Sequence, residues 1–318
     1  MTIPTIQDIK QAKERISTSI HQTPVITSTS INNELGCSLF FKCENFQKVG
    51  AFKFRGATNA IECLPPSLLK NGVATHSSGN HAAAMALAAQ QRGVPAYIVM
   101  PSNAPLVKQL AVKAYGGQIT WCEPSLTSRE QTLAQIIEQT GASFIHPYNN
   151  FDVICGQGTA ALELLEQIDI PDIVITPVGG GGLLSGTSIA VKSILPNCKV
   201  YGAEPLIAND AFLSLKTRIL QPPFPTQTIA DGLRTSLSEL TFQIIKTNVD
   251  QILCASEQSI IKAMKLIWER LKIVVEPSSA VPLAAIMENK QLFVGKKIAL
   301  ILSGGNVDLE NLPFKAAD

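Results

Sequence analysis

Short, almost wholly apolar runs alternate with longer helix-like segments along most of this 318-residue chain. Strands are expected at 38–44, 72–78, 96–101, 117–123 and 143–147, and then at 172–178, 199–205, 251–256 and 297–303. Helices are expected between them, including one at 128–140, with Ser128 and Gln131 as a capping box, and one at 158–168. Because strands that are buried on both faces read as continuous apolar runs, the alternation predicts an α/β fold with parallel sheets.

The two series of runs predict two parallel-sheet α/β lobes. The smaller lobe is expected to be mobile and to comprise residues 72–147, and the larger lobe residues 1–71 together with 148–318. Ligands of parallel sheets bind at the carboxyl ends of the strands, and the polar and glycine-rich motifs of this chain follow such runs. The cleft between the lobes is therefore the expected binding site.

The composition narrows the class of protein. Apolar residues make up 46% of the chain and charged residues 16%, which is typical of a well-buried globular protein. Lys and Arg number 26 against 25 Asp and Glu, so no net field would attract nucleic acid. The seven cysteines are odd in number and form no CxxC pair, which indicates a reducing compartment. A secretory signal pattern and a membrane-spanning run are both missing, so we expect a cytoplasmic protein that binds no membrane.

Lys53 stands between Phe52 and Phe54, with Gly50 and Gly56 close by. Lysine is rarely buried without a partner, so these aromatic neighbours leave two interpretations open. The simpler one is a surface lysine whose aliphatic stem lies along apolar neighbours. The other is an amine whose pKa is lowered so that it can act as a nucleophile.

Four consecutive glycines, Gly179 to Gly182, separate an expected strand from an expected helix. A bare backbone can turn its N–H groups toward an anion, and the helix N-terminus adds a partial positive charge. The pattern favours a phosphate site over a close-packed turn, and it matches neither the dinucleotide fingerprint nor the P-loop.

Two other polar motifs also follow strands. Residues 77–81, SSGNH, open an expected helix and suit a small carboxylate, or else a helix cap with a satisfied histidine. Ser303 ends the last run, where Ser-Gly-Gly taken alone indicates only a turn. Together, a reactive lysine, a phosphate cup and a carboxylate cradle predict an aldehyde cofactor that carries a phosphate.

The motifs GAFKFRGA, SSGNH, GGGGLLSG, AEP, ADG, VVEP and SGGN occur in the order seen in pyridoxal-phosphate enzymes of fold type II. Over nearly its whole length the chain resembles eukaryotic-type serine racemases, the related serine/threonine dehydratases and the threo-3-hydroxyaspartate dehydratases. The resemblance implies a tryptophan-synthase-β-like fold with pyridoxal 5'-phosphate in the cleft between the lobes. It also implies a small hydroxy-amino-acid substrate and a homodimer.

The resemblance further implies roles for individual residues. Lys53 matches the lysine that condenses with the cofactor aldehyde, and Ser303 matches the partner of the pyridine nitrogen. The cofactor-binding residues it implies are Phe52, Lys53, Asn80, Gly179, Gly180, Gly181, Gly182, Leu183 and Ser303. The substrate-binding residues it implies are Ser77, Ser78, Gly79, Asn80, His81 and Arg129.

Ser78 matches a serine with which racemases of this family protonate the opposite face of the substrate, where threonine dehydratases commonly carry alanine. With Lys53, it is the expected catalytic residue of a serine racemase that also dehydrates serine and threonine to an α-keto acid and ammonia. One alternative is an ammonia-lyase for threonine or L-threo-3-hydroxyaspartate without significant racemisation. The other is a non-catalytic phosphate- or nucleotide-binding module. Arg129 could pair with a substrate carboxylate or be a solvated arginine at a helix start.

A metal site is implied at Glu204, the Ala208 carbonyl and Asp210, which match the ligands of Mg²⁺ in the family. Two carboxylates and a carbonyl suit a hard cation, so Mn²⁺ or Ca²⁺ would also be accommodated. The simpler alternative is a solvated acidic loop.

ATP is a candidate effector, with Lys48, Lys272 and Asn306 as expected nucleotide contacts. The pair Ala82-Ala83 departs from the relatives, which usually carry glutamine at the second position, and this puts activation by ATP in doubt. Tyr148 is typical of the fungal racemase and hydroxyaspartate dehydratase branch.

Overall fold

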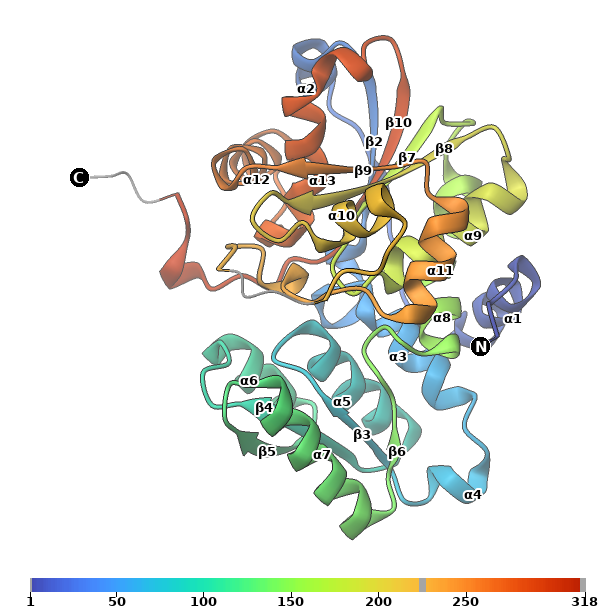
Figure 1. Ribbon diagram of the computed structural model, residues 1–318, viewed down its shortest axis with the longest axis vertical. Coiled ribbons are helices and arrows are strands. Elements are labelled where there is room, and N and C mark those ends of the chain that lie inside the picture. Colours follow the sequence, from blue (N-terminus) through green and yellow to red (C-terminus); the bar gives the residue numbers. More distant parts are fainter. Residues whose placement is uncertain (1, 223–226, 315–318) are drawn as a thin grey trace.

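The computed structural model describes residues 2–222 and 227–314, and it contains two sheets in two lobes (Figure 1). The six-stranded sheet has the order β1-β2-β10-β7-β8-β9, and the four-stranded sheet has the order β5-β4-β3-β6. The strands of the first sheet are, in that order, Val25–Ile26, Ser38–Cys43, Lys297–Leu302, Ile173–Pro177, Lys199–Pro205 and Gln251–Ala255. Those of the second are Gln118–Cys122, Ala96–Pro101, Val73–His76 and Ser143–Phe144. The predicted parallel sheets are confirmed, except that β1 pairs antiparallel with β2.

Helices cover both faces of each sheet, as the continuous apolar strands require. The helices of the described residues are α1 Ile6–Ile16, α2 Thr29–Leu35, α3 Lys53–Glu62, α4 Pro66–Leu69, α5 Asn80–Arg92, α6 Leu106–Ala114, α7 Leu126–Thr140, α8 Phe151–Gln167, α9 Gly182–Ile194, α10 Asp210–Thr217, α11 Glu239–Asn248, α12 Glu257–Leu271 and α13 Pro277–Glu288. One core packs α12 and α13 on the larger sheet, and a second packs α8, α9 and α11 on its other face. In the smaller lobe, α5 covers one face of the sheet and α7 the other.

Two helix starts differ from the sequence prediction. The N-cap of α7 is Ser125, whose hydroxyl accepts from the backbone N–H of Ser128 at 3.1 Å, so the predicted cap lies inside the helix. Helix α8 begins at Phe151, before the predicted 158, because Asn150 caps it and its glycines serve packing instead of ending the helix. A Cβ on Gly156 would lie 2.6 Å from the Gly56 Cα, so α3 and α8 are in backbone contact there.

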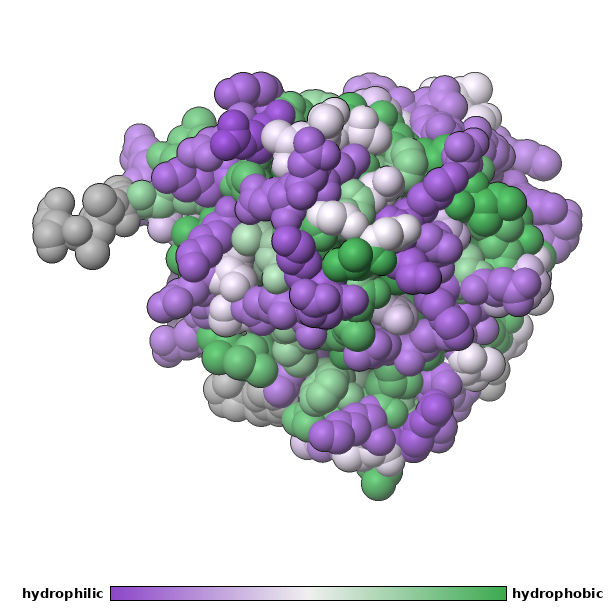
Figure 2. Space-filling view, turned by 90° about the horizontal axis from the view of Figure 1, so that it is seen from above, coloured by the Kyte–Doolittle hydropathy of each residue, from purple (hydrophilic) through white to green (hydrophobic). Residues whose placement is uncertain are grey.

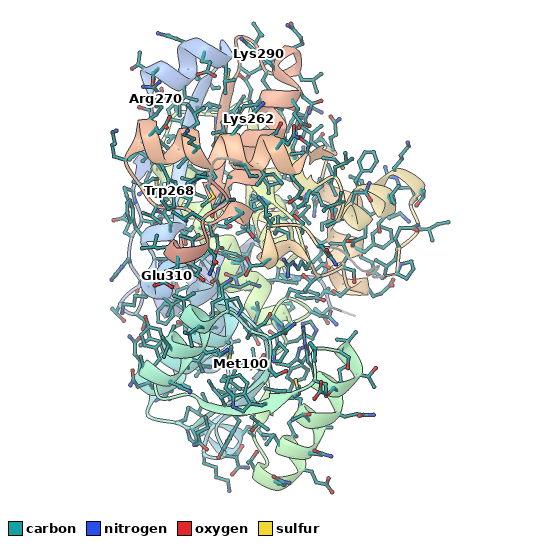
Figure 3. All side chains as sticks on the ribbon, turned by 90° about the vertical axis from the view of Figure 1, so that its left-hand side faces the viewer. Met100, Lys262, Trp268, Arg270, Lys290 and Glu310 are labelled. Carbon is teal, nitrogen blue, oxygen red and sulfur yellow. The ribbon has the colours of Figure 1, made fainter. Side chains whose placement is uncertain are left out.

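The surface gives no sign of a membrane segment. Within residues 2–222 and 227–314, no helix has the length and apolar character needed to cross a bilayer. Seen from above, polar side chains cover most of the face of the larger lobe, with apolar groups between them (Figure 2). On the side view, Lys262 and Arg270 project from α12, whereas Met100 is enclosed in the smaller lobe (Figure 3).

The sheets are arranged so that β3, β7 and β10 end at one cavity between the lobes. The residues that follow these strands, 77–81, 178–182 and 303–306, carry the motifs of the sequence. The exact ends of the two domains in the chain, and the mobility of the smaller one, remain predictions.

Candidate active site

One cavity collects residues from both lobes at the carboxyl ends of the strands. Its lining includes all of the predicted cofactor and substrate residues, namely Phe52, Lys53, Ser77, Ser78, Gly79, Asn80, His81, Arg129, Gly179, Gly180, Gly181, Gly182, Leu183 and Ser303. The chain therefore brings segments far apart in sequence to one place, as expected for a ligand site of parallel sheets.

Lys53 is the first residue of α3 and lies inside the cavity. Its ammonium Nζ donates to the carbonyl of Pro147 at 2.9 Å and sits 5.2 Å from the centre of the Phe52 ring. Burial lowers its pKa from 10.5 to about 8, although the carboxylate of Glu276 opposes this shift. Part of the amine is therefore neutral near neutral pH, and its place in the cavity favours the interpretation of a nucleophile over that of a surface lysine.

The four glycines form a turn between β7 and α9 that leaves no room for side chains. A Cβ on Gly180 would come within 2.5 Å of the Tyr148 ring, and one on Gly181 would lie 2.7 Å from Leu237 Cδ2. Gly181 also has φ +86°, in the left-handed region that favours glycine, and it is the N-cap of the 13-residue helix α9. A bare backbone at the N-terminus of a long helix is the arrangement that holds a phosphate.

Residues 77–81 turn from β3 into α5. The N–H of Gly79 donates to the Ser77 hydroxyl at 3.2 Å, and Ser78 lies beside them on the cavity wall. Burial, with the charges of Lys53 and His146 nearby, holds the pKa of His81 well below its usual value, so this imidazole is neutral. The turn thus presents hydroxyls and backbone N–H groups to the cavity.

Asn80 and Ser303 are held by partners on the larger lobe. The Asn80 amide donates to Glu276 Oε1 at 2.7 Å and accepts from the Asn306 amide at 3.0 Å. The Ser303 and Ser279 hydroxyls share a hydrogen bond of 3.2 Å. The backbone N–H of Phe52 donates to the Ser303 carbonyl at 3.0 Å, which ties the end of β10 to the segment that carries the reactive lysine.

These features pass a test of fit for a phosphorylated aldehyde. The cavity contains an amine whose pKa is lowered, a glycine cradle that any side chain would fill, and a hydroxyl, Ser303, buried at the end of β10. The donor set therefore matches the aldehyde, the phosphate and a ring heteroatom of one cofactor.

Three charged residues of the cavity were not picked out by the sequence analysis. Lys108 on α6 forms an ion pair with Asp231 of the larger lobe. Burial raises the pKa of Glu276 to about 7, although the Lys108 ammonium opposes the shift. Asp231 and Glu276 belong to the motifs ADG and VVEP, which could have marked them, but Lys108, in the first turn of α6, belongs to none of the motifs of the sequence.

Arg129 lies on α7 and lines the cavity, but no acidic partner within 4.0 Å is recorded for it among the ion pairs of the described residues. Its Nε is buried and has no hydrogen-bond partner there. The guanidinium is thus a cation of the cavity whose charge a ligand could balance.

The predicted metal ligands lie outside the cavity lining, at the end of β8 and the start of α10. Burial, with Asp210 beside it, raises the pKa of Glu204 well above its usual value, and burial raises that of Asp210 to about 6. Asp210 Oδ2 is buried without a hydrogen-bond partner, which fits a cation. No group of three or more Asp, Glu, His or Cys side chains in the described ranges could hold a metal, so a cation here would also need the Ala208 carbonyl and waters.

The expected nucleotide contacts do not line the cavity. Asn306 donates to the Val49 carbonyl at 2.7 Å, and the Lys48 ammonium lies 5.6 Å from the centre of the Phe54 ring. Lys272 is exposed at the end of α12. A role for these residues with ATP stays a prediction.

Comparisons with known proteins also indicate a pyridoxal-phosphate enzyme. A family model described as "Pyridoxal-phosphate dependent enzyme" matches residues 16–304. The chain is 50% identical over 314 residues to the beta-hydroxyaspartate dehydratase of Paracoccus denitrificans, covering 99% of this chain and 100% of that protein. It is 51% identical over 318 residues to a serine racemase of Dictyostelium discoideum, covering 98% of each. The structure of maize serine racemase superposes with a TM-score of 0.95 at 48% identity, covering 97% of this chain and 95% of that one.

Proposed function

This chain belongs to the family of pyridoxal-phosphate dependent enzymes, close to the serine racemases and hydroxyaspartate dehydratases, and we propose that it is a serine racemase that also dehydrates serine and threonine. Its fold is the tryptophan-synthase-β-like fold type II of these enzymes. The observation that carries the proposal is that Lys53 and Ser78, from different lobes, line one cavity. Membership of an enzyme family removes the support for a non-catalytic binding module.

When bound, pyridoxal phosphate supplies an electron sink for negative charge at the α-carbon of an amino acid. We assign its phosphate to Gly179–Gly182, its ring oxygen to Asn80 and its ring nitrogen to Ser303. A serine hydroxyl shared with Ser279 places no negative charge at that nitrogen, so it does not enforce protonation as an aspartate would.

Lys53 acts as the base on one face of the α-carbon. Its pKa of about 8 leaves part of the amine neutral near neutral pH, so it can accept the α-proton there. Ser78 delivers a proton to the other face, and this exchange inverts the configuration. Loss of the substrate's hydroxyl instead of reprotonation leads to α-keto acid and ammonia.

The test is a panel of L-serine, D-serine, L-threonine and threo-3-hydroxyaspartate, with and without Mg²⁺, in which keto acid and enantiomer are measured separately. Ser78→Ala should lower racemisation by about 10²-fold or more, the usual effect of losing a general acid or base, and leave dehydration of L-serine nearly intact. The control is Ser67→Ala, at an exposed serine of α4 that does not line the cavity. Equal racemisation by Ser78→Ala and the unaltered protein would refute the assignment.

A second candidate function is dehydration of L-threo-3-hydroxyaspartate as the main activity. The unpaired guanidinium of Arg129 favours it, because this substrate carries a second carboxylate that needs a cation. Arg129→Gln should then reduce turnover of hydroxyaspartate about tenfold more than turnover of serine, and Arg129→Lys should recover part of the loss. Equal losses on both substrates would exclude this role.

Other expectations complete the proposal. Glu204, Ala208 and Asp210 bind Mg²⁺, Mn²⁺ or Ca²⁺, the protein is a cytoplasmic homodimer, and the smaller lobe closes on the substrate. A role for ATP is the weakest of these, because Ala82-Ala83 departs from the relatives.

A further inference from the structure

Four charged side chains are buried together in the larger lobe. Lys42, Glu44, Arg55 and Glu163 come from β2, the short turn after it, α3 and α8, and each is 5% exposed or less. Two are cations and two are anions, so the group is neutral as a whole. We call these four residues the buried charge quartet.

Arg55 at the centre of the quartet uses all five of its N–H donors. Its Nε and Nη2 donate to the two oxygens of Glu44 at 2.7 and 2.8 Å. Its Nη1 and Nη2 donate to the two oxygens of Glu163, both at 3.1 Å. Two longer contacts run from Nη1 to the Thr159 hydroxyl at 3.4 Å and from Nη2 to the Thr23 hydroxyl at 3.5 Å. Two forked pairs of this kind fix the guanidinium plane as well as its position.

The Lys42 ammonium likewise uses all three of its N–H donors. Its ammonium donates to Glu163 at 2.5 Å, to the Thr23 carbonyl at 2.7 Å and to the Gln167 side chain at 2.7 Å. Burial alone would raise the pKa of Glu163, but Arg55 and Lys42 hold it below its usual value. Glu163 therefore stays charged, and its hydrogen bonds to Arg55 and Lys42 fix the geometry of the group.

The quartet is joined to the reactive amine through α3. Arg55 follows Lys53 by two residues in the first turn of α3, and Phe52 at the start of that helix provides no side-chain cap. The acceptor of Lys53, the Pro147 carbonyl, lies just before α8, which carries Glu163. Figure 1 shows α3 and α8 together between the lobes, and their backbones touch at Gly56 and Gly156.

We propose that the buried charge quartet positions Lys53, with Arg55 as the positioning residue that fixes the first turn of α3 against β2 and α8. The proposal rests on the proposed role of Lys53 and adds to it the residues that hold the amine in the cavity. Stability alone does not account for the quartet, because apolar side chains of similar volume often stabilise a core at least as well as buried ion pairs. Fixed forks on three elements instead give a single register between the helix that carries the amine and the helix that follows its acceptor.

The test measures Lys53 in the cofactor-free protein. Trace acetylation with acetic anhydride over a series of pH values, read by mass spectrometry, gives the midpoint at which Lys53 becomes reactive, with the exposed Lys10 as internal reference. The midpoint of the unaltered protein should lie near 8. Arg55→Lys keeps the charge but loses the fork, and it should raise the midpoint by about one unit or more, which leaves about tenfold less neutral amine at pH 7. Glu163→Gln should shift it in the same direction.

A variant that leaves a void in the core far from Lys53 separates an effect on the position of Lys53 from an effect on stability. Met264→Ala on α12 removes a fully buried side chain of another core, and it should lower the melting temperature without moving the Lys53 midpoint. Arg55→Lys and Glu163→Gln variants that melt lower but keep the midpoint near 8 would overturn the proposal.

If Arg55→Lys and Glu163→Gln do not fold, the milder Thr159→Val, which removes only one acceptor of Arg55, decides by the same readout. A shift to higher pH then supports the proposal, and an unchanged midpoint overturns it. The measurement needs neither racemisation nor elimination, so its result stands apart from the outcome of the substrate panel.

Discussion

Replacing Gly180 by alanine tests whether the glycine turn is a built cradle. Gly180 does not have a positive φ in the structure, so alanine at this position causes no backbone strain. Its Cβ would instead come within 2.5 Å of three carbons of the Tyr148 ring, where ordinary van der Waals contact begins at 3.4 Å. The cost is therefore steric and is borne by one identified neighbour.

The magnitude follows from how far Tyr148 can move. Its ring already packs edge-to-face on His146, with ring centres 4.5 Å apart, and it lies on the cavity wall. Inserting an atom into a packed site of this kind costs about 1–3 kcal/mol. The melting temperature of the cofactor-free protein should fall by a few degrees. If the displaced ring also narrows the cradle, binding of pyridoxal phosphate should weaken by about 5- to 150-fold, the equivalent of the same free energy.

The assay is thermal melting of the cofactor-free protein together with titration by pyridoxal phosphate, followed by absorbance. Gly93→Ala isolates the other source of cost, because Gly93 has a positive φ of 73° and no atom within 4 Å of the added Cβ. It should lower the melting temperature through backbone strain alone and leave the cofactor affinity unchanged. Adding Tyr148→Ala to Gly180→Ala removes the clash and should restore the melting temperature toward that of Tyr148→Ala alone. The cofactor affinity should recover less, because the cradle still carries a methyl group.

A Gly180→Ala variant that melts and binds the cofactor like the unaltered protein would contradict the assignment of a phosphate cradle to this turn. Loss of stability with full cofactor affinity would mean that the turn is required for packing only.

Three other perturbations have defined outcomes. Lys53→Ala should bind pyridoxal phosphate without a borohydride-trapped adduct, as mass spectrometry would detect. The unfolded Lys53 amine, with its pKa of 10.5, binds more protons than the folded one at about 8, so the stability of the cofactor-free protein should rise with pH between these values. Lys53→Met should lose that rise, which is roughly 3 kcal/mol at most, and identical pH profiles of melting would refute it. With chelator present, Asp210→Asn should melt above the unaltered protein near neutral pH, because it removes a carboxyl group whose burial is unfavourable to its charged form and raises its pKa to about 6. Saturating Mg²⁺ should reverse the order, since it stabilises only the intact site, by about 2.7 kcal/mol at a hundredfold excess over Kd. If Mg²⁺ changes the melting temperature of neither protein, the proposed metal site is refuted.

Local patterns were enough to predict most of the architecture. Continuous apolar runs mark strands buried on both faces, so the two parallel sheets could be predicted, and the glycine run after β7 predicts an anion site. The start of α8 was predicted seven residues too late, at 158 instead of Phe151; Gly156 and Gly158 lie inside the helix, where they allow α8 to touch neighbouring backbone. Short strand β1 was missed because two residues carry no periodicity.

The chemistry of Lys53 could not be settled in this way, because the aromatic neighbours of Lys53 suit either a surface or a reactive lysine. Its pKa depends on desolvation and on Glu276, which stands more than two hundred residues further along the chain. The ion pair of Lys108 with Asp231, which comes from the other lobe, and the forked hydrogen bonds from Arg55 to Glu163 also join residues far apart in the chain. An apolar pattern is a property of neighbouring residues, so it can be recognised in a stretch of sequence. Burial and the distances between charges exist only once remote segments are packed together, and these two quantities set the reactivity of the site.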